Sequence, residues 1–185
     1  MNKMIETLLS RQSHNKLTEP APTDEQLDIL FSAALRAPDH ALLKPWRFRV
    51  YKGESLKVLG EFFVQASLAD SNDLSEEKQD KIRNKPLRAP IVIIASVSLT
   101  EHPKVPEIEQ YLSTGASVQN ILMAAHFQNI GAIWRTGSLA FNPHLHRLLE
   151  MPENEKIVGF IYLGQEEGER RKLKSVDVKD FVIRA

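Results

Sequence analysis

Apolar positions recur along the chain with a helical period in its first part. Thr23 precedes such a stretch, and Gln26 follows three residues later, which is the pattern of a capping box. Pro38 cannot continue a helix and disfavours helical geometry at Ala37. We therefore predict a helix that begins after Thr23 and ends before Pro38. Its core-facing stripe comprises Leu27, Leu30, Phe31, Ala34 and Leu35.

Four other stretches have the pattern of strands. Residues 46–53 alternate apolar and polar side chains, which indicates a half-buried strand. Residues 90–99 and 156–164 are apolar on both faces, as in a strand covered on both sides. Residues 132–135 suit a shorter strand.

Further helices are expected around these strands. A short one ends near Arg11, with Met4, Ile5, Leu8 and Leu9 on one face. Others are expected over 55–68 with Ser55 as the cap, over 106–128, and from Pro143. The polar stretch 70–85 is expected to be a surface excursion, part loop and part helix.

The long helix expected over 106–128 has only small residues at 113–117. Gly115 costs about 1 kcal/mol in a helix interior relative to alanine. We therefore expect another backbone or a flat ligand to approach closely there. Helices and strands are interspersed without regular βαβ order, so a helix-flanked mixed sheet in one domain, 1–185, is the predicted architecture.

The amino-acid composition argues against several classes of function. Lys and Arg equal Asp and Glu at 24 each, which argues against a general binder of nucleic acid or anionic membrane. The chain has no cysteine, so any redox chemistry requires a bound cofactor. The longest apolar run, 91–95, is too short to span a bilayer, and the N-terminus lacks a signal-peptide core. We expect a cytoplasmic protein.

Several common sites are excluded by their motifs. The chain contains no GxGxxG, GxxxxGK[ST] or G-x-S-x-G pattern. His144 and His146 are alternate residues that point apart on a helix, so we interpret them as surface residues and predict no metal site. Glu76, Glu77 and Asp80 are expected to form a solvated face.

Three clusters remain as candidates. Arg11 and Ser13 at the end of the first helix can bind a phosphate, although a solvated helix end has the same pattern. Arg36 and His40 flank a proline turn and can direct donors into one cleft, while a helix stop before a core tryptophan explains part of the segment. Residues 131–137 run from a strand into a glycine-bounded loop that can hold a flat ring or be an ordinary turn.

These clusters, in this order, resemble the nitroreductase family. The similarity includes Arg-x-Ser at 11–13, APDHALLKPW at 37–46 and VGFIYLG at 158–164, and it covers essentially the whole chain. APDH at 37–40 and AIWRTG at 132–137 are most similar to a compact, YdjA-like branch. The resemblance implies an α+β fold with a mixed, mainly antiparallel sheet flanked by helices, and a long central helix at a homodimer interface.

The resemblance also implies an FMN site. Arg11, Gln12 and Ser13 would line the phosphate and ribityl side, and Arg36 and His40 would reach FMN from the partner subunit. Two further groups match the branch. Trp134, Arg135 and Thr136 would edge the flavin ring, and Ala124, Ala125, His126, Phe127, Gln128 and Asn129 match a stretch associated with the nicotinamide cofactor.

The chain departs from the family pattern where Leu42 and Lys44 replace an asparagine and a glutamine, and where Asn15 precedes the basic Lys16. Arg36 is a physical substitute at the N1/O2 edge of the flavin, since a cation stabilises the anionic reduced ring. The basic run 170–174 is expected to be solvated, with a phosphate contact as the alternative.

The expected reaction is ping-pong. NADH or NADPH delivers hydride to flavin N5, and a small electron-poor acceptor such as a nitroaromatic, a quinone or an activated alkene then takes it; no side chain need act as acid or base. A flavin carrier or sensor without NAD(P)H turnover is one alternative. An interaction module without a cofactor, docking through 70–85, is another.

Overall fold

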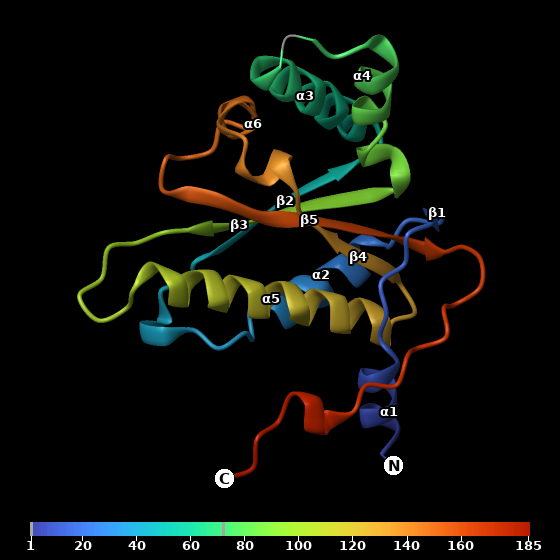
Figure 1. The fold of residues 1–185 in the computed structure, drawn as a ribbon, viewed down its shortest axis with the longest axis vertical. Helices are drawn as coiled ribbons and strands as arrows, with labels where there is room; N and C mark the ends of the chain where they lie inside the picture. Colours follow the sequence, from blue (N-terminus) through green and yellow to red (C-terminus); the bar gives the residue numbers. More distant parts are fainter. Residues whose placement is uncertain (1, 72) are drawn as a thin grey trace.

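A central sheet separates two layers of helices in the computed structural model, which describes residues 2–71 and 73–185 (Figure 1). Helices α3, α4 and α6 cover one face, and α2 and α5 cover the other. Helix α1 and the C-terminal tail lie beyond α5. The helices are α1 (Lys3–Ser10), α2 (Asp24–Ala34), α3 (Glu54–Asp70), α4 (Glu76–Arg83), α5 (Glu107–Phe127) and α6 (Pro143–Leu148).

The sheet has the order β1-β5-β3-β2, and β4 pairs with β5 beside β1. All pairings in the described residues are antiparallel, so the parallel part of the expected mixed sheet is not found there. The predicted α+β class is confirmed. The strands are β1 (Leu17–Thr18), β2 (Trp46–Lys52), β3 (Ile91–Ser98), β4 (Gly131–Arg135) and β5 (Glu155–Glu166).

Strand β3 explains why the fold has two cores. Val92 and Ile94 pack with α3 and α6 residues, whereas Ile91 and Ile93 pack with residues of α2 and α5. All four side chains are fully buried. A central strand covered on both faces must be apolar on both faces, which is the pattern that the sequence shows.

Helix α2 begins as the sequence predicts. The Gln26 backbone N–H donates to the Thr23 hydroxyl (3.2 Å), and the Thr23 N–H donates to Gln26 Oε1 (2.9 Å), which completes the capping box. Leu27, Leu30 and Ala34 are buried. Leu35 is 55% exposed, so its place in the predicted stripe is wrong: it is the C-cap, where the chain leaves the helix.

Helix α3 differs from the expectation at its start. It begins at Glu54, and its N-cap is Gly53 at φ 57° rather than Ser55. The Ser55 hydroxyl instead accepts from the Lys52 N–H at 2.8 Å and donates to the Lys52 carbonyl, closing the turn after β2. Within the predicted polar stretch 70–85, Asp70 belongs to α3 and residue 72 lies outside the described residues; the rest is part loop and part helix α4, as predicted.

Gly115, in the middle of α5, has no tight partner among the described residues of the chain. A Cβ added to Gly115 would meet only the Trp134 ring, at an ordinary 3.9 Å. Ser113, Thr114 and Ser117 are buried beside it. The tight approach expected at Gly115 is therefore not made by any described residue of the same chain.

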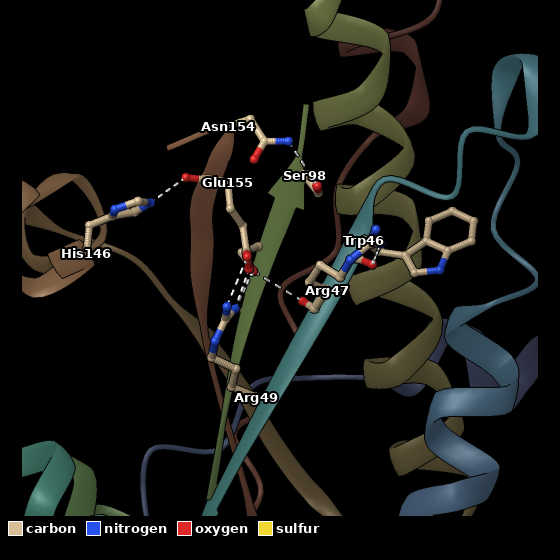
Figure 2. A network of polar contacts seen from close by, with 8 residues as sticks. Trp46, Arg47, Arg49, Ser98, His146, Asn154 and Glu155 are labelled. Carbon is tan, nitrogen blue, oxygen red and sulfur yellow. Dashed lines mark hydrogen bonds and ion pairs between the residues drawn. The ribbon is translucent and has the colours of Figure 1, made fainter. Parts of the chain in front are cut away.

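A buried ion pair joins three strands at one end of the sheet (Figure 2). Both oxygens of Glu155 on β5 accept from the Arg49 guanidinium of β2, and Ser96 of β3 donates to the same carboxylate. Burial alone would raise the pKa of Glu155, but the hydrogen bonds from Arg49 and Ser96 outweigh it and hold the pKa below its usual value. Next to it, His146 Nε2 lies 2.6 Å from the Glu155 carbonyl oxygen.

Candidate functional site

A cationic cavity lies where β4 ends. Its volume is about 210 Å3, and Lys85, Arg88 and Arg135 bring three positive side chains to it. None of its lining residues is acidic. A cavity with this charge suits an anionic ligand. The remaining lining residues are Phe63, Thr136, Gly137, Ser138, Leu139, Phe160 and Tyr162. We call this cavity the cationic cradle.

Arg135 is fixed in the cradle by two contacts. Its guanidinium carbon lies 5.6 Å from the centre of the Tyr162 ring, and its Nη2 donates to Asn15 Oδ1 at 3.4 Å. Its Nε is buried and has no hydrogen-bond partner among the described residues. Because a buried donor without an acceptor is costly, this N–H is suited to an oxygen or nitrogen of a bound ligand.

Lys85 reaches the cradle from the turn before β3. Burial lowers the pKa of Lys85, and the positive charge of Arg88 lowers it further. An anion in the cradle would reverse part of this effect, because it favours the charged ammonium. Neither Lys85 nor Arg88 was among the residues that the sequence singled out. The only signal was two basic residues in NKPLRAP, directly before the buried strand.

Trp134 and Arg135 lie on opposite faces of β4. Trp134 packs with the core under α2 and α5, and its Nε1 donates to the Val158 carbonyl at 3.2 Å. Gly159 makes room for it, since a Cβ there would lie 2.1 Å from Trp134 Nε1. Of the predicted ring-edge residues, Arg135 and Thr136 therefore line the cradle, while the Trp134 side chain turns away from it.

The predicted phosphate segment runs past the same strand. After α1 ends, the His14 N–H donates to the Ala132 carbonyl of β4 at 3.1 Å. Asn15 then meets Arg135. The structure thus brings His14 and Asn15, which directly follow the predicted phosphate residues, alongside β4. Arg11 and Gln12 are half-buried and Ser13 is exposed.

Arg36 and His40 do not meet the cradle within one chain. Arg36 lines a different cavity of about 500 Å3, at the end of α2, which shares no lining residue with the cradle. His40 Nδ1 lies 2.6 Å from Glu109 Oε2 on α5. The exposed Leu42, which replaces a polar residue of the family pattern, lines the Arg36 cavity.

The predicted nicotinamide stretch is divided by burial. Ala124, Ala125 and His126 are buried, and the two alanines belong to the core beneath the sheet. Phe127 and Asn129 are exposed and Gln128 is half-buried at the end of α5. Within one chain, only the second half of this stretch is open to a ligand.

Two other expectations concern metals and membranes. His144 Nδ1 lies 2.7 Å from Arg147, and His146 contacts the Glu155 backbone, so the two histidines do not share a ligand position. Across 2–71 and 73–185, no group of three or more His, Asp or Glu residues could hold a metal ion. No helix in those ranges is long and apolar enough to cross a membrane.

Comparison with known proteins identifies the family. The model of the nitroreductase family matches residues 8–165. The chain belongs to the nitroreductase family. The predicted family is thereby confirmed, and with it the class of oxidoreductases. A relative from Escherichia coli, named "Putative NAD(P)H nitroreductase YdjA", is 41% identical over 160 residues, which is 86% of each chain.

Solved structures of this family share the fold. A nitroreductase-like protein from Bacillus cereus has a TM-score of 0.85 at 22% identity, covering all of this chain and 97% of its own. A nitroreductase from Bacteroides fragilis, solved with bound FMN, has a TM-score of 0.77 at 20% identity and covers 100% of both chains. At these identities the structures show the fold.

Proposed function

We propose that this nitroreductase-family chain is an FMN-dependent oxidoreductase that moves hydride from NADH or NADPH to a small electron-poor acceptor. The observation that carries the proposal is the cationic cradle at the end of β4, in a chain that belongs to this family. FMN bound with its phosphate or one edge of its ring in the cradle would supply hydride chemistry, because the flavin itself carries the hydride. Its relative YdjA is named for NAD(P)H, and the relative from Bacteroides fragilis was solved with FMN.

The residues of the cradle fit an anionic flavin. Lys85, Arg88 and Arg135 place positive charge where a phosphate or a reduced ring brings negative charge. The partnerless Nε–H of Arg135 is suited to donate to the same ligand. Arg11 and Ser13, on the segment beside β4, supply a guanidinium and a hydroxyl for phosphate. In this proposal the side chains bind, orient and neutralise charge, and none acts as acid or base.

A second copy of the chain completes the proposed site. Arg36 and His40 lie away from the cradle of their own chain, so they act on FMN only from a partner subunit. Helix α1 buries none of its residues and leaves Met4, Leu8 and Leu9 exposed. The tail likewise exposes Phe181. Large apolar side chains exposed on a helix and on a terminal tail support an interface at these segments. Sedimentation at twice the mass of one chain is expected, and a monomer at micromolar concentration would contradict the homodimer.

The proposal is tested by binding and turnover in the same preparation. Titration with FMN should quench flavin fluorescence, and the loaded protein should oxidise NADH or NADPH with menadione or a nitrofuran as acceptor. A ping-pong reaction gives parallel double-reciprocal lines when both substrates are varied. Because NADH and NADPH belong to the cell interior, the proposal includes a cytoplasmic location.

A matched pair of variants tests whether FMN binds at the cradle. Arg135→Met should weaken FMN binding by at least about tenfold, the effect of losing one charge-assisted hydrogen bond. Lys57→Met removes a cation on the exposed face of α3 and should change nothing. FMN binding without NAD(P)H oxidation would favour the carrier or sensor. Absence of FMN binding would favour the interaction module.

A further inference from the structure

The segment Arg11–Ser13 is held on both sides by a histidine that the proposed chemistry does not use. His126 contacts Ser10, the residue directly before the segment, and His14 is the residue directly after it. His126 is 8% exposed, and the His14 side chain is 12% exposed. A buried polar ring with a fixed partner favours one arrangement of the backbone that carries it.

The upstream contact fixes the end of α1. The Ser10 hydroxyl donates to the Thr7 carbonyl at 2.8 Å, so its oxygen accepts from His126 Nε2 at 3.0 Å. Helix α1 contains no residue that is buried within its own chain. The contact from His126, at the end of α5, therefore ties the last residue of α1 to the body of the same chain, directly before Arg11.

The downstream contact fixes the other end of the segment. The His14 N–H is bound to the Ala132 carbonyl, and His14 Nε2 lies 3.1 Å from Glu166 Oε1, at ion-pair distance without hydrogen-bond geometry. Glu166 in turn accepts from Arg170 Nε at 2.7 Å and from its Nη2 at 3.1 Å. Arg170, the first residue of the basic run, is thereby engaged by a carboxylate.

Burial favours the neutral form of both rings. It lowers the pKa of His14; Glu166 opposes the shift, while Arg170, His126 and Arg11 add to it. Burial also lowers the pKa of His126, against a hydrogen bond to the Thr7 backbone and the charge of Glu166. Each ring therefore contacts its neighbours as a neutral group rather than as a further cation for the phosphate.

We propose that His126 and His14 are positioning residues that hold Arg11–Ser13 in the conformation that binds the FMN phosphate. The inference rests on the proposed function. It implies that the two histidines contribute to phosphate recognition through the backbone they anchor, without touching the ligand. Their loss should affect FMN, which carries the phosphate, much more than riboflavin, which lacks it.

The test compares the two flavins in the same variants. His126→Leu and His14→Leu should each weaken FMN binding by about tenfold, equivalent to about 1.4 kcal/mol, and riboflavin binding by less than twofold. His126→Gln should recover most of the loss, because its amide can donate to Ser10. Ser10→Ala should reproduce the loss of His126→Leu, and the double variant should add nothing further. His144→Leu, on α6, is the control and should change neither affinity.

The outcomes separate the inference from the function on which it rests. A wild-type protein that binds neither flavin overturns both. Wild-type binding of FMN, with an unchanged ratio of FMN to riboflavin affinity in His126→Leu and Ser10→Ala, overturns the inference alone. An equal loss of both flavins also overturns it, since that result indicates a general structural role. If His126→Leu fails to fold, Ser10→Ala decides, because it removes only one half-buried hydroxyl at the end of α1.

Discussion

The Arg49–Glu155 pair gives the prediction that the structure defines most fully. Glu155→Gln keeps the shape of the side chain but removes the charge that neutralises Arg49. The Glu155 side chain is 4% exposed and that of Arg49 is 28% exposed, so the remaining guanidinium is only partly hydrated. Removing one partner of a buried pair costs about 3–5 kcal/mol, and the partial exposure of Arg49 favours the lower end, about 3 kcal/mol.

This loss is large compared with the stability of a domain. Unfolding free energies are about 5–15 kcal/mol, and a chain of this size loses roughly 2–4 °C in Tm per kcal/mol. We therefore expect a fall of about 6–12 °C in Tm and a lower urea midpoint at unchanged m-value. Glu153→Gln, an exposed carboxylate two residues away, is the control and should stay within about 0.5 kcal/mol of wild type.

A double variant distinguishes the cost of leaving Arg49 without a partner charge from the cost of lost side-chain packing. Replacing the pair by Glu155→Leu with Arg49→Met removes both charges, and hydrophobic replacement of a buried pair is often neutral or stabilising. The double variant should therefore be more stable than Glu155→Leu alone. Two results would contradict this explanation. One is a free energy of unfolding for Glu155→Gln within about 0.5 kcal/mol of the wild-type value; the other is a further loss of stability when Arg49→Met is added to Glu155→Leu.

Three further predictions follow from individual side chains. Lys85→Met should weaken FMN binding about tenfold by fluorescence titration; an unchanged affinity removes Lys85 from the site. Gly159→Ala should lower stability by more than about 2 kcal/mol in urea, since its Cβ would meet Trp134 at 2.1 Å; wild-type stability would contradict this. Burial lowers the pKa of His14 and His126 in the folded chain, so the unfolded chain binds more protons below about pH 6.5. The free energy of unfolding should therefore decrease as the pH is lowered below about 6.5. Urea midpoints of His14→Gln with His126→Gln should depend less on pH over that range.

Local signals predicted the elements well where one interaction decides them. The capping box of Thr23 and the doubly apolar strand 91–98 are both set by neighbours in sequence or by period. Ser55 failed as a cap because its hydroxyl closes the preceding turn instead. Leu35 fits the helical period, but the chain has already left the helix there.

The site was predictable only in part. Two of the three predicted ring-edge residues, Arg135 and Thr136, line the cradle, whereas Trp134 does not. Lys85 and Arg88 were missed because their convergence with Arg135 depends on a turn before β3 that brings distant segments together. Arg36 lies away from the cradle in its own chain, and the expectation that it reaches FMN from a partner subunit comes from the family resemblance rather than from a pattern within the chain.

The proposed function depends on FMN binding at the cationic cradle. The most direct measurement is an FMN titration of wild-type protein against Arg135→Met and Lys85→Met, followed by flavin fluorescence and absorbance. We expect saturable binding of one FMN per chain by the wild type, weakened about tenfold or more in each variant. Protein that shows no flavin absorbance and gains none on incubation with FMN, or variants that bind FMN as tightly as wild type, would contradict it.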